Sequence, residues 1–301
     1  FRPPDRAASP PPPPPDALRL PLPHRLLMPP FLDFHGRLAW RTTNSVEVLG
    51  VHIPVSPSLA VNRSDEAGWN SFVAGIRPNS GLKSAIKTLL WPLRRASENI
   101  LGHQFLQYRL ARWMRRYADT TTVFLECGPG DMSLRRFLPN DLAYNAIEFG
   151  LSEFQVRRVL KRDRRVNLCL ASIEDIPLPD DCVTMVACVE MLQHVPDVDK
   201  AFRELRRVCV KGARIMVTVA NGHCKKVKTK GPNKHFIHLF TEASFRARVE
   251  AAGLKVLEHE QVGVWVPVPS KLIGGHSMHW PTTGKSEYEN CYFVYLLEVV
   301  K

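Results

Sequence analysis

The stretch Thr122-Val-Phe-Leu-Glu-Cys-Gly-Pro-Gly-Asp131 decides the fold of this 301-residue chain. An apolar run that ends in a glycine turn is typical of a buried strand that delivers its backbone to a ligand. Gly128 and Gly130 would let main-chain N–H groups approach a bound molecule closely, and a helix is predicted over residues 134–138. The stretch therefore predicts the front half of a nucleoside-binding α/β fold.

A second apolar run, Ala143-Tyr-Asn-Ala-Ile-Glu148, ends in an acid 18 residues after Gly130. A carboxylate at this strand end can accept hydrogen bonds from both hydroxyls of a ribose. A dinucleotide-binding motif needs a third glycine at position 133, where this chain has Ser133. The pattern therefore does not match a dinucleotide site.

The rest of the chain continues the alternation of strands and helices. A loop over residues 171–181 leads into an apolar run over 183–189, which predicts another strand. A helix is expected over 198–208 and a strand over 213–219. Two further strands are predicted, over residues 254–261 and 292–300, and one or two short strands over residues 46–55.

Four motifs, in this order, resemble those of the class I S-adenosylmethionine-dependent methyltransferases, particularly the broad small-molecule branch. Besides the glycine turn, the 171–181 loop is similar to that family's "LPFPD" loop. Glu190-Met-Leu-Gln-His-Val195 is similar to its "E-hydrophobic-x-x-H-V" loop. The segment His235-Phe-Ile-His-Leu-Phe-Thr241, running to Ala252-Gly-Leu254, is similar to its late helix.

The resemblance covers residues 105–300 and implies the architecture. It implies a Rossmann-like seven-stranded mixed sheet with helices on both faces and an antiparallel C-terminal edge strand. We expect residues 105–301 to form the S-adenosylmethionine-binding domain, and 31–104 an N-terminal extension with short strands and a helix that covers the cofactor. Residues 1–30 hold 12 of the 25 prolines, which predicts a disordered extension.

The resemblance also implies S-adenosylmethionine as cofactor, bound at the carboxyl ends of the parallel strands. The residues that it assigns to cofactor binding are Glu126, Cys127, Gly128, Gly130, Glu148, Ser172, Ile173, Val189 and Glu190. Substrate is expected over the same edge of the sheet, contacted by the loops after the fourth and fifth strands and by residues 265–289.

The glycine turn can be aligned with the family in two registers. In one, Phe124 stands where the family has an acid that binds the ammonium group of the methionine moiety. In the other, Glu126 is that acid and Met132 replaces the third glycine. We favour Glu126, because a charge-assisted hydrogen bond to the ammonium is the stronger contact. Ser172 and Thr184 also replace acids that the family often has, which leaves room for a noncatalytic relative.

His194 is the best candidate for a catalytic base, because imidazole titrates near neutral pH and the resemblance places its loop beside the transferred methyl group. The competing interpretation is a histidine that caps or packs the next helix. His235 and His238 are the next candidates, and His276, His279 and Trp280 belong to a long connection that could line the substrate. No spacing of histidine and cysteine matches a zinc site, so we expect no metal.

The charge of +12 is concentrated in residues 1–120, which carry 16 Lys and Arg against 8 Asp and Glu. No apolar stretch is long enough for a transmembrane segment. The seven cysteines form no CxxC pair, and five of them lie within or beside apolar elements, which favours buried thiols in a reducing compartment: Cys127, Cys169, Cys182, Cys188 and Cys209. We therefore expect a cytoplasmic protein; the first residue is Phe1, so organelle import stays open. The oligomeric state is not indicated.

Three functions compete. The favoured one is methylation of a small-molecule substrate. RNA or protein as the methyl acceptor is the less favoured alternative, suggested by the net charge and by five lysines over residues 225–234. A noncatalytic, methyltransferase-like binding protein is the third.

Overall fold

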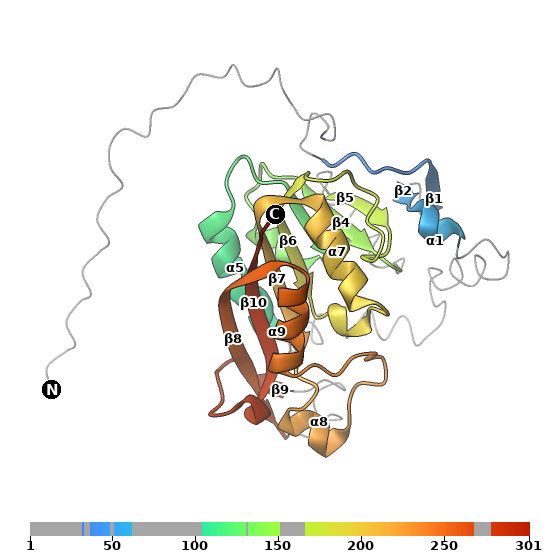
Figure 1. Cartoon of the computed structure of the whole chain (residues 1–301). Helices are drawn as coiled ribbons and strands as arrows, with labels where there is room; N and C mark the ends of the chain where they lie inside the picture. The colour runs from blue at the N-terminus through green and yellow to red at the C-terminus, as the bar shows by residue number, and fades with distance from the viewer. Residues whose placement is uncertain are drawn as a thin grey trace, which may run out of the picture.

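The structure is a computed structural model that describes residue 32 and residues 37–48, 51–61, 104–130, 132–150, 166–267 and 278–301. Within these residues, ten strands form one sheet in the order β1-β2-β5-β4-β3-β6-β7-β10-β8-β9 (Figure 1). The strands are β1 (Asn44–Val48), β2 (Val51–Val55), β3 (Phe124–Cys127), β4 (Tyr144–Glu148), β5 (Val166–Leu170), β6 (Val183–Val189), β7 (Cys209–Ala220), β8 (Leu254–Val266), β9 (Met278–Trp280) and β10 (Asn290–Val299). The predicted extension over residues 1–30 lies outside the described residues.

The expected mixed character of the sheet is confirmed, but the described residues form ten strands instead of the seven predicted, because β1, β2 and β9 add to it. Strands β5, β4, β3, β6 and β7 are parallel neighbours, and β10 and β8 add the antiparallel part. The structure also refines the expectation. The terminal strand β10 lies between β7 and β8 instead of at the edge, because it pairs with both, and the short strand β9 forms the edge beyond β8.

The described helices are α1 (Pro57–Val61), α5 (Gln104–Tyr117), α7 (Val198–Val208), α8 (Lys225–Lys230) and α9 (Glu242–Ala251). Three short 3₁₀ segments, η2 (Ser133–Phe137), η3 (Leu192–His194) and η5 (Glu287–Glu289), complete the described secondary structure. The stretch 134–138, predicted to be helical, is therefore largely 3₁₀. The predicted helix over 198–208 and strand over 183–189 match α7 and β6.

Two hydrophobic clusters cover the two faces of the sheet. Helices α7 and α9 pack on one face, where Phe202 and Phe245 meet edge to face at 5.8 Å (Figure 1). Helix α5 buries Leu110 and Trp113 on the other face. A parallel sheet needs this double cover because both of its faces are apolar. The side chain of Asp197 caps α7 by accepting the amide of Lys200 at 2.8 Å.

Salt bridges connect helix α5 to strand β8. Arg109 and Arg112 pair with Glu260, and Arg116 pairs with Glu258 at 2.7 Å. The indole N–H of Trp113 donates to Glu258 at 2.9 Å. The side chains of Arg112 and Arg116 stay partly exposed, at 44% and 54%, while they make these pairs.

The predicted short strands over residues 46–55 are the antiparallel pair β1 and β2. They join the large sheet, because β2 runs parallel to β5 and the Ser56 amide donates to the Leu170 carbonyl at 2.7 Å. Residues ahead of β1 also contact the sheet. The Leu38 amide donates to the side chain of Asn145, and the Trp40 indole donates to Asn167, both at 2.8 Å.

Candidate functional site

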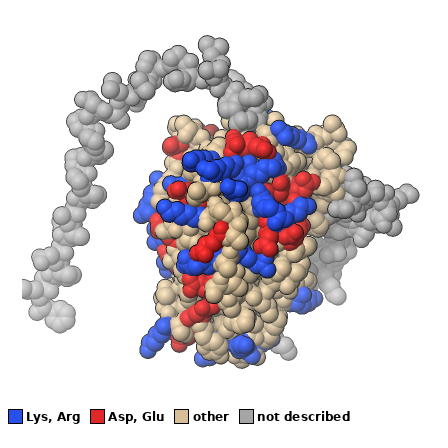
Figure 2. Space-filling view, viewed as in Figure 1, with Lys and Arg blue, Asp and Glu red and all other residues tan. Residues whose placement is uncertain are grey.

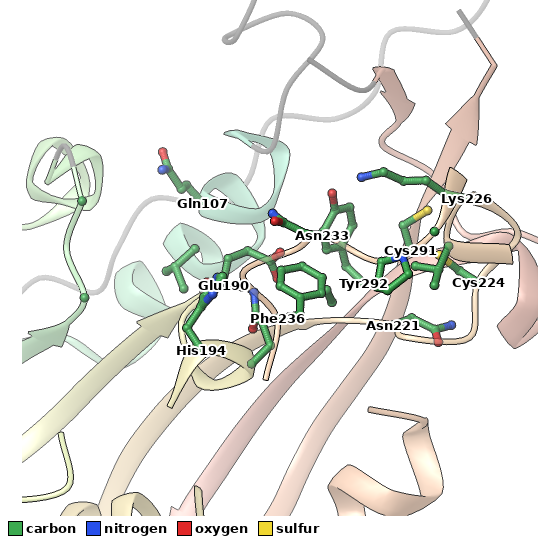
Figure 3. A pocket seen from close by; sticks show the side chains of 18 of the residues that line it. Gln107, Glu190, His194, Asn221, Cys224, Lys226, Asn233, Phe236, Cys291 and Tyr292 are labelled. Atoms are coloured by element: carbon green, nitrogen blue, oxygen red, sulfur yellow. Dashed lines mark hydrogen bonds between the residues drawn. The ribbon is translucent and has the colours of Figure 1, made fainter. Parts of the chain in front are cut away.

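A cavity of about 570 Å³ lies where β3, β6 and β7 end and where β10 begins (Figure 3). Parallel strands present their carboxyl ends at one edge of a sheet, and an antiparallel neighbour starts at that same edge. The cavity is lined by Gln107, Glu126, Gly128, Pro129, Gly130, Val189, Glu190, Gln193, His194, Ala220, Asn221, Cys224, Lys226, Val227, Gly231, Pro232, Asn233, Phe236, Cys291 and Tyr292.

The glycine turn bends through three left-handed residues, Gly128 (φ 68°), Gly130 (φ 53°) and Met132 (φ 55°). A Cβ on Gly128 would lie 3.0 Å from the Cβ of Met191, so this position also needs glycine for space. Met132 holds the left-handed conformation despite its side chain, which is a strained backbone for an unbranched apolar residue. It is the residue that replaces the third glycine when Glu126 is taken as the acid.

Glu126 reaches the cavity from β3. Its side chain is only 2% exposed, and its carboxylate accepts a hydrogen bond from the phenol of Tyr144 on β4. Phe124, the residue at the acid position in the other register, is fully buried with its ring 5.7 Å from that of Tyr144. The structure thus brings a carboxylate from the Glu126 position to the cavity and keeps Phe124 in the core.

Glu148 lies at the end of β4, next to the glycine turn. One carboxylate oxygen accepts the amide of Gly130 at 3.3 Å, and the other accepts the amide of Phe149 at 3.0 Å. Burial raises the pKa of this carboxyl, and the backbone hydrogen bonds oppose the shift. Glu148 is not among the residues that line the described cavity.

Glu190 follows β6 in a left-handed conformation with φ 53°. Its amide donates to the hydroxyl of Thr218 on β7 at 3.0 Å, and the Thr218 hydroxyl lies 3.4 Å from the Glu190 carboxylate. Burial raises the pKa of Glu190 to about 8, although nearby Lys226 opposes the shift. The carboxyl is therefore largely protonated at neutral pH and can donate as well as accept a hydrogen bond in the cavity.

His194 ends the η3 segment and lines the same cavity. Its Nδ1 lies 2.9 Å from the carbonyl oxygen of His235, and its ring meets Phe236 edge to face at 5.3 Å. A carbonyl oxygen only accepts, so Nδ1 of the neutral ring carries the proton and Nε2 is an acceptor. His235 thus supplies a carbonyl, and His238 points its Nε2 at the Val195 carbonyl, 2.9 Å away.

Three other predicted cofactor residues are placed outside the cavity. The Cys127 side chain is fully buried in the core between β3 and β6. Ile173 is 4% exposed and belongs to the same hydrophobic cluster. The Ser172 hydroxyl accepts the amide of Glu174 at 3.1 Å and lies 3.2 Å from its carboxylate, so it shapes its own loop. His279 of β9, 3% exposed, is likewise not in the cavity wall.

The sequence did not single out the residues of the cavity wall opposite the glycine turn, although it predicted that the loop after β7 contacts the substrate. Asn221 directly follows β7, so the rule of carboxyl strand ends was sufficient to find it. Cys291 and Tyr292 begin β10, and only the antiparallel direction of that strand brings them to this edge. Cys224 and Lys226 come from the loop after β7, which was predicted to contact the substrate.

A family model described as a methyltransferase domain matches residues 125–217. The match runs from β3 through β7, the strands that hold the glycine turn, Glu190 and His194. By this match, residues 125–217 are a methyltransferase domain of the class I, S-adenosylmethionine-dependent type.

Two curated methyltransferases are similar to parts of the chain. The 27-O-demethylrifamycin SV methyltransferase of Amycolatopsis mediterranei is 26% identical over 167 residues, which cover 51% of this chain and 61% of that protein. Methyltransferase GfsG of Streptomyces halstedii is 30% identical over 130 residues, 40% of this chain and 46% of that protein. The matches thus span less than two thirds of either relative.

Solved methyltransferase structures share the fold at low identity. The methyltransferase in complex with the Trm112 activator of Haloferax volcanii matches with a TM-score of 0.53 and 15% identity, over 70% of this chain and 95% of that one. An S-adenosylmethionine-dependent methyltransferase of Clostridium acetobutylicum matches with a TM-score of 0.50 and 10% identity, over 73% of this chain and 100% of that one. Among the helices that the structure describes, none has the length and apolar character needed to cross a membrane.

Proposed function

We propose that this chain transfers a methyl group from S-adenosylmethionine to a hydroxyl of a small molecule. The observation that carries the proposal is the shared cavity. It joins a buried carboxylate, Glu126, and the glycine turn at one side to an imidazole, His194, whose Nε2 is free to accept a proton. A volume of about 570 Å³ lies within the range of small-molecule pockets.

The cofactor contacts in this proposal follow the strand ends. Glu126 binds the methionine ammonium with a charge-assisted hydrogen bond, and Gly128 and Gly130, which have no side chain, let the cofactor lie close to the backbone of the turn. Glu148, next to the turn, accepts the ribose hydroxyls. Ser172 and Ile173, which lie outside the cavity, take no part in the proposed contacts. Val189 and Glu190 lie between the cofactor and the acceptor.

Methyl transfer is an in-line displacement at the carbon attached to the sulfonium, and the leaving group is a neutral thioether. The protein therefore has to align the reactants, exclude water and take the proton of a hydroxyl acceptor. In the proposed step, Nε2 of His194 takes that proton while Nδ1 keeps its hydrogen bond to His235. The name of the relative from Amycolatopsis mediterranei, which includes an O-demethylated acceptor, supports an oxygen nucleophile.

Among the residues that the structure describes, the face that carries α7 and α9 offers no continuous basic surface for RNA. On the face that carries α7 and α9, Lys and Arg lie beside Asp and Glu instead of forming a continuous basic surface (Figure 2). Arg207 pairs with Asp180 at 2.8 Å, and Arg248 pairs with Asp199 at 2.6 Å. Paired arginines have less to gain from phosphates, because binding would first break an existing contact.

Calorimetric titration with S-adenosylhomocysteine, followed by mass spectrometry of small hydroxylated acceptors incubated with S-adenosylmethionine, tests the proposal. We expect cofactor binding and an acceptor heavier by one methylene unit. Binding without transfer to any acceptor would favour the noncatalytic alternative. Absence of binding would reject the proposed function, and salt-sensitive retention on RNA would favour the nucleic-acid alternative.

A further inference from the structure

Two cysteines meet in the wall of the cavity at the end away from Glu190 and His194 (Figure 3). Cys224 immediately precedes α8, and Cys291 is the second residue of β10. They are 1% and 3% exposed, and both line the cavity. The two thiol side chains interact with each other although 67 positions separate them in sequence.

A second pair of cysteines provides a comparison within the same chain. Cys127 on β3 and Cys188 on β6 are direct partners in the parallel register, and their thiols also interact. Both are fully buried, and neither lines the cavity. The two pairs therefore share the contact between thiols and differ in whether a small reagent in the cavity can reach them.

The surroundings of Cys224 favour its thiolate. The interaction with Cys291 is the main cause that lowers the Cys224 pKa to about 6. The backbone amides of Val227 and Lys226 and the Lys226 ammonium act in the same direction, and burial opposes them. The same interaction, with burial, raises the pKa of Cys291. Burial raises the pKa of Cys127 instead. Since the thiolate is the reactive form, Cys224 is the nucleophile and Cys291 the resolving thiol.

We propose that Cys224 and Cys291 are a redox pair that closes to a disulfide when hydrogen peroxide enters the cavity. The Cys224 thiolate attacks one peroxide oxygen; an S–O bond forms, the O–O bond breaks, and hydroxide leaves and becomes water. The Cys291 sulfur then attacks the Cys224 sulfur, an S–S bond forms, and the sulfenic oxygen leaves as a second water. Two thiols lose two electrons, and one peroxide gains them.

The disulfide would join α8 to β10. Lys226 and Val227 of α8 line the cavity, as does Tyr292 next to Cys291. The bond would therefore fix one wall of the cavity in place and close a loop of the chain, which raises stability. The proposal does not depend on methyl transfer, because the oxidation needs neither cofactor nor acceptor.

The test is oxidation of the folded, reduced full chain with hydrogen peroxide at pH 7, without cofactor. After alkylation of the remaining thiols and digestion without reductant, mass spectrometry should find a peptide pair linked through Cys224 and Cys291. We expect this link at least about tenfold above any Cys127–Cys188 link, since reactivity follows access and thiolate character. Dithiothreitol should remove it, and Tm should be about 5 °C higher in the oxidised protein.

Two variants assign the roles of the thiols. In Cys291→Ser, the sulfenic acid has no partner, so dimedone should label Cys224; in Cys224→Ser, Cys291 should stay unlabelled. The link in the unchanged protein tests the proposal even if a variant fails to fold. No Cys224–Cys291 link, or an equal Cys127–Cys188 link, would overturn it. Cofactor titration of the reduced protein is unaffected by that result, so failure here is distinct from failure of the proposed function.

Discussion

Tyr144 donates the hydrogen of its phenol to the carboxylate of Glu126 from the neighbouring parallel strand. The contact holds the carboxylate at the cavity, where its charge can meet a cation. A buried carboxylate is stabilised by such contacts, and a charged partner adds more than a neutral one. The pair therefore marks the place where we expect the ammonium group of the cofactor.

Glu126→Gln should weaken binding of S-adenosylhomocysteine by about 1.5–3 kcal/mol, or roughly 10- to 150-fold, because a hydrogen bond between two charges is lost. The ligand itself supplies the control. 5′-Methylthioadenosine lacks the amino-acid group, so calorimetry should show its affinity unchanged in the variant. Equal losses for both ligands would instead mean that the substitution disturbs the glycine turn and that Glu126 does not bind the ammonium.

Glu148→Ala should weaken binding of S-adenosylhomocysteine by about 1.5–3 kcal/mol if its carboxylate accepts the ribose hydroxyls. A comparison of adenosine with 2′-deoxyadenosine separates this role from the contact between Glu148 and Gly130. The unchanged protein should prefer adenosine, and the variant should bind both equally. A variant that keeps the preference would reject the ribose assignment.

His194→Asn should lower the rate of methyl transfer to a hydroxyl acceptor by about 100-fold, the lower end for loss of a general base. Asparagine can retain a donor near the position of Nδ1, so the contact with His235 survives while Nε2 is lost. Binding of S-adenosylhomocysteine should not change. His238→Asn is the control, because His238 directs its Nε2 to the Val195 carbonyl. Equal activity of the two variants would show that His194 is not the base that takes the proton.

The raised pKa of Glu190 makes stability depend on pH. Its folded-state pKa, about 8, exceeds the ordinary value of 4.5, so the folded protein favours the protonated carboxyl. The stabilisation is fully present below pH 4.5, declines as pH rises and is gone above pH 8. Glu190→Gln should therefore melt at a Tm that changes less between pH 5 and about 8.5 than that of the unchanged protein. If the Tm of the variant and that of the unchanged protein change with pH in the same way, the pKa of Glu190 is not raised in the folded protein.

The sequence correctly predicted those strands and helices whose residue pattern lies entirely within one short segment. The apolar run of β6 and the apolar spacing of α7 are periodic patterns that need no distant partner. The glycine turn likewise depends on backbone freedom at Gly128 and Gly130. Strain at Met132 was not predicted, because a side chain in the left-handed region persists only when surrounding contacts hold it there.

The sequence by itself determined the class of fold and the edge of the sheet at which a ligand would bind, because strand ends and glycine turns are local features. Only the tertiary structure decided how the cavity is completed. Insertion of β10 between β7 and β8 brings Cys291 beside Cys224, and the loop after β7 brings the His235 carbonyl to His194. Such contacts join residues 41 and 67 positions apart, and strand order and loop packing, which no local pattern encodes, place them together.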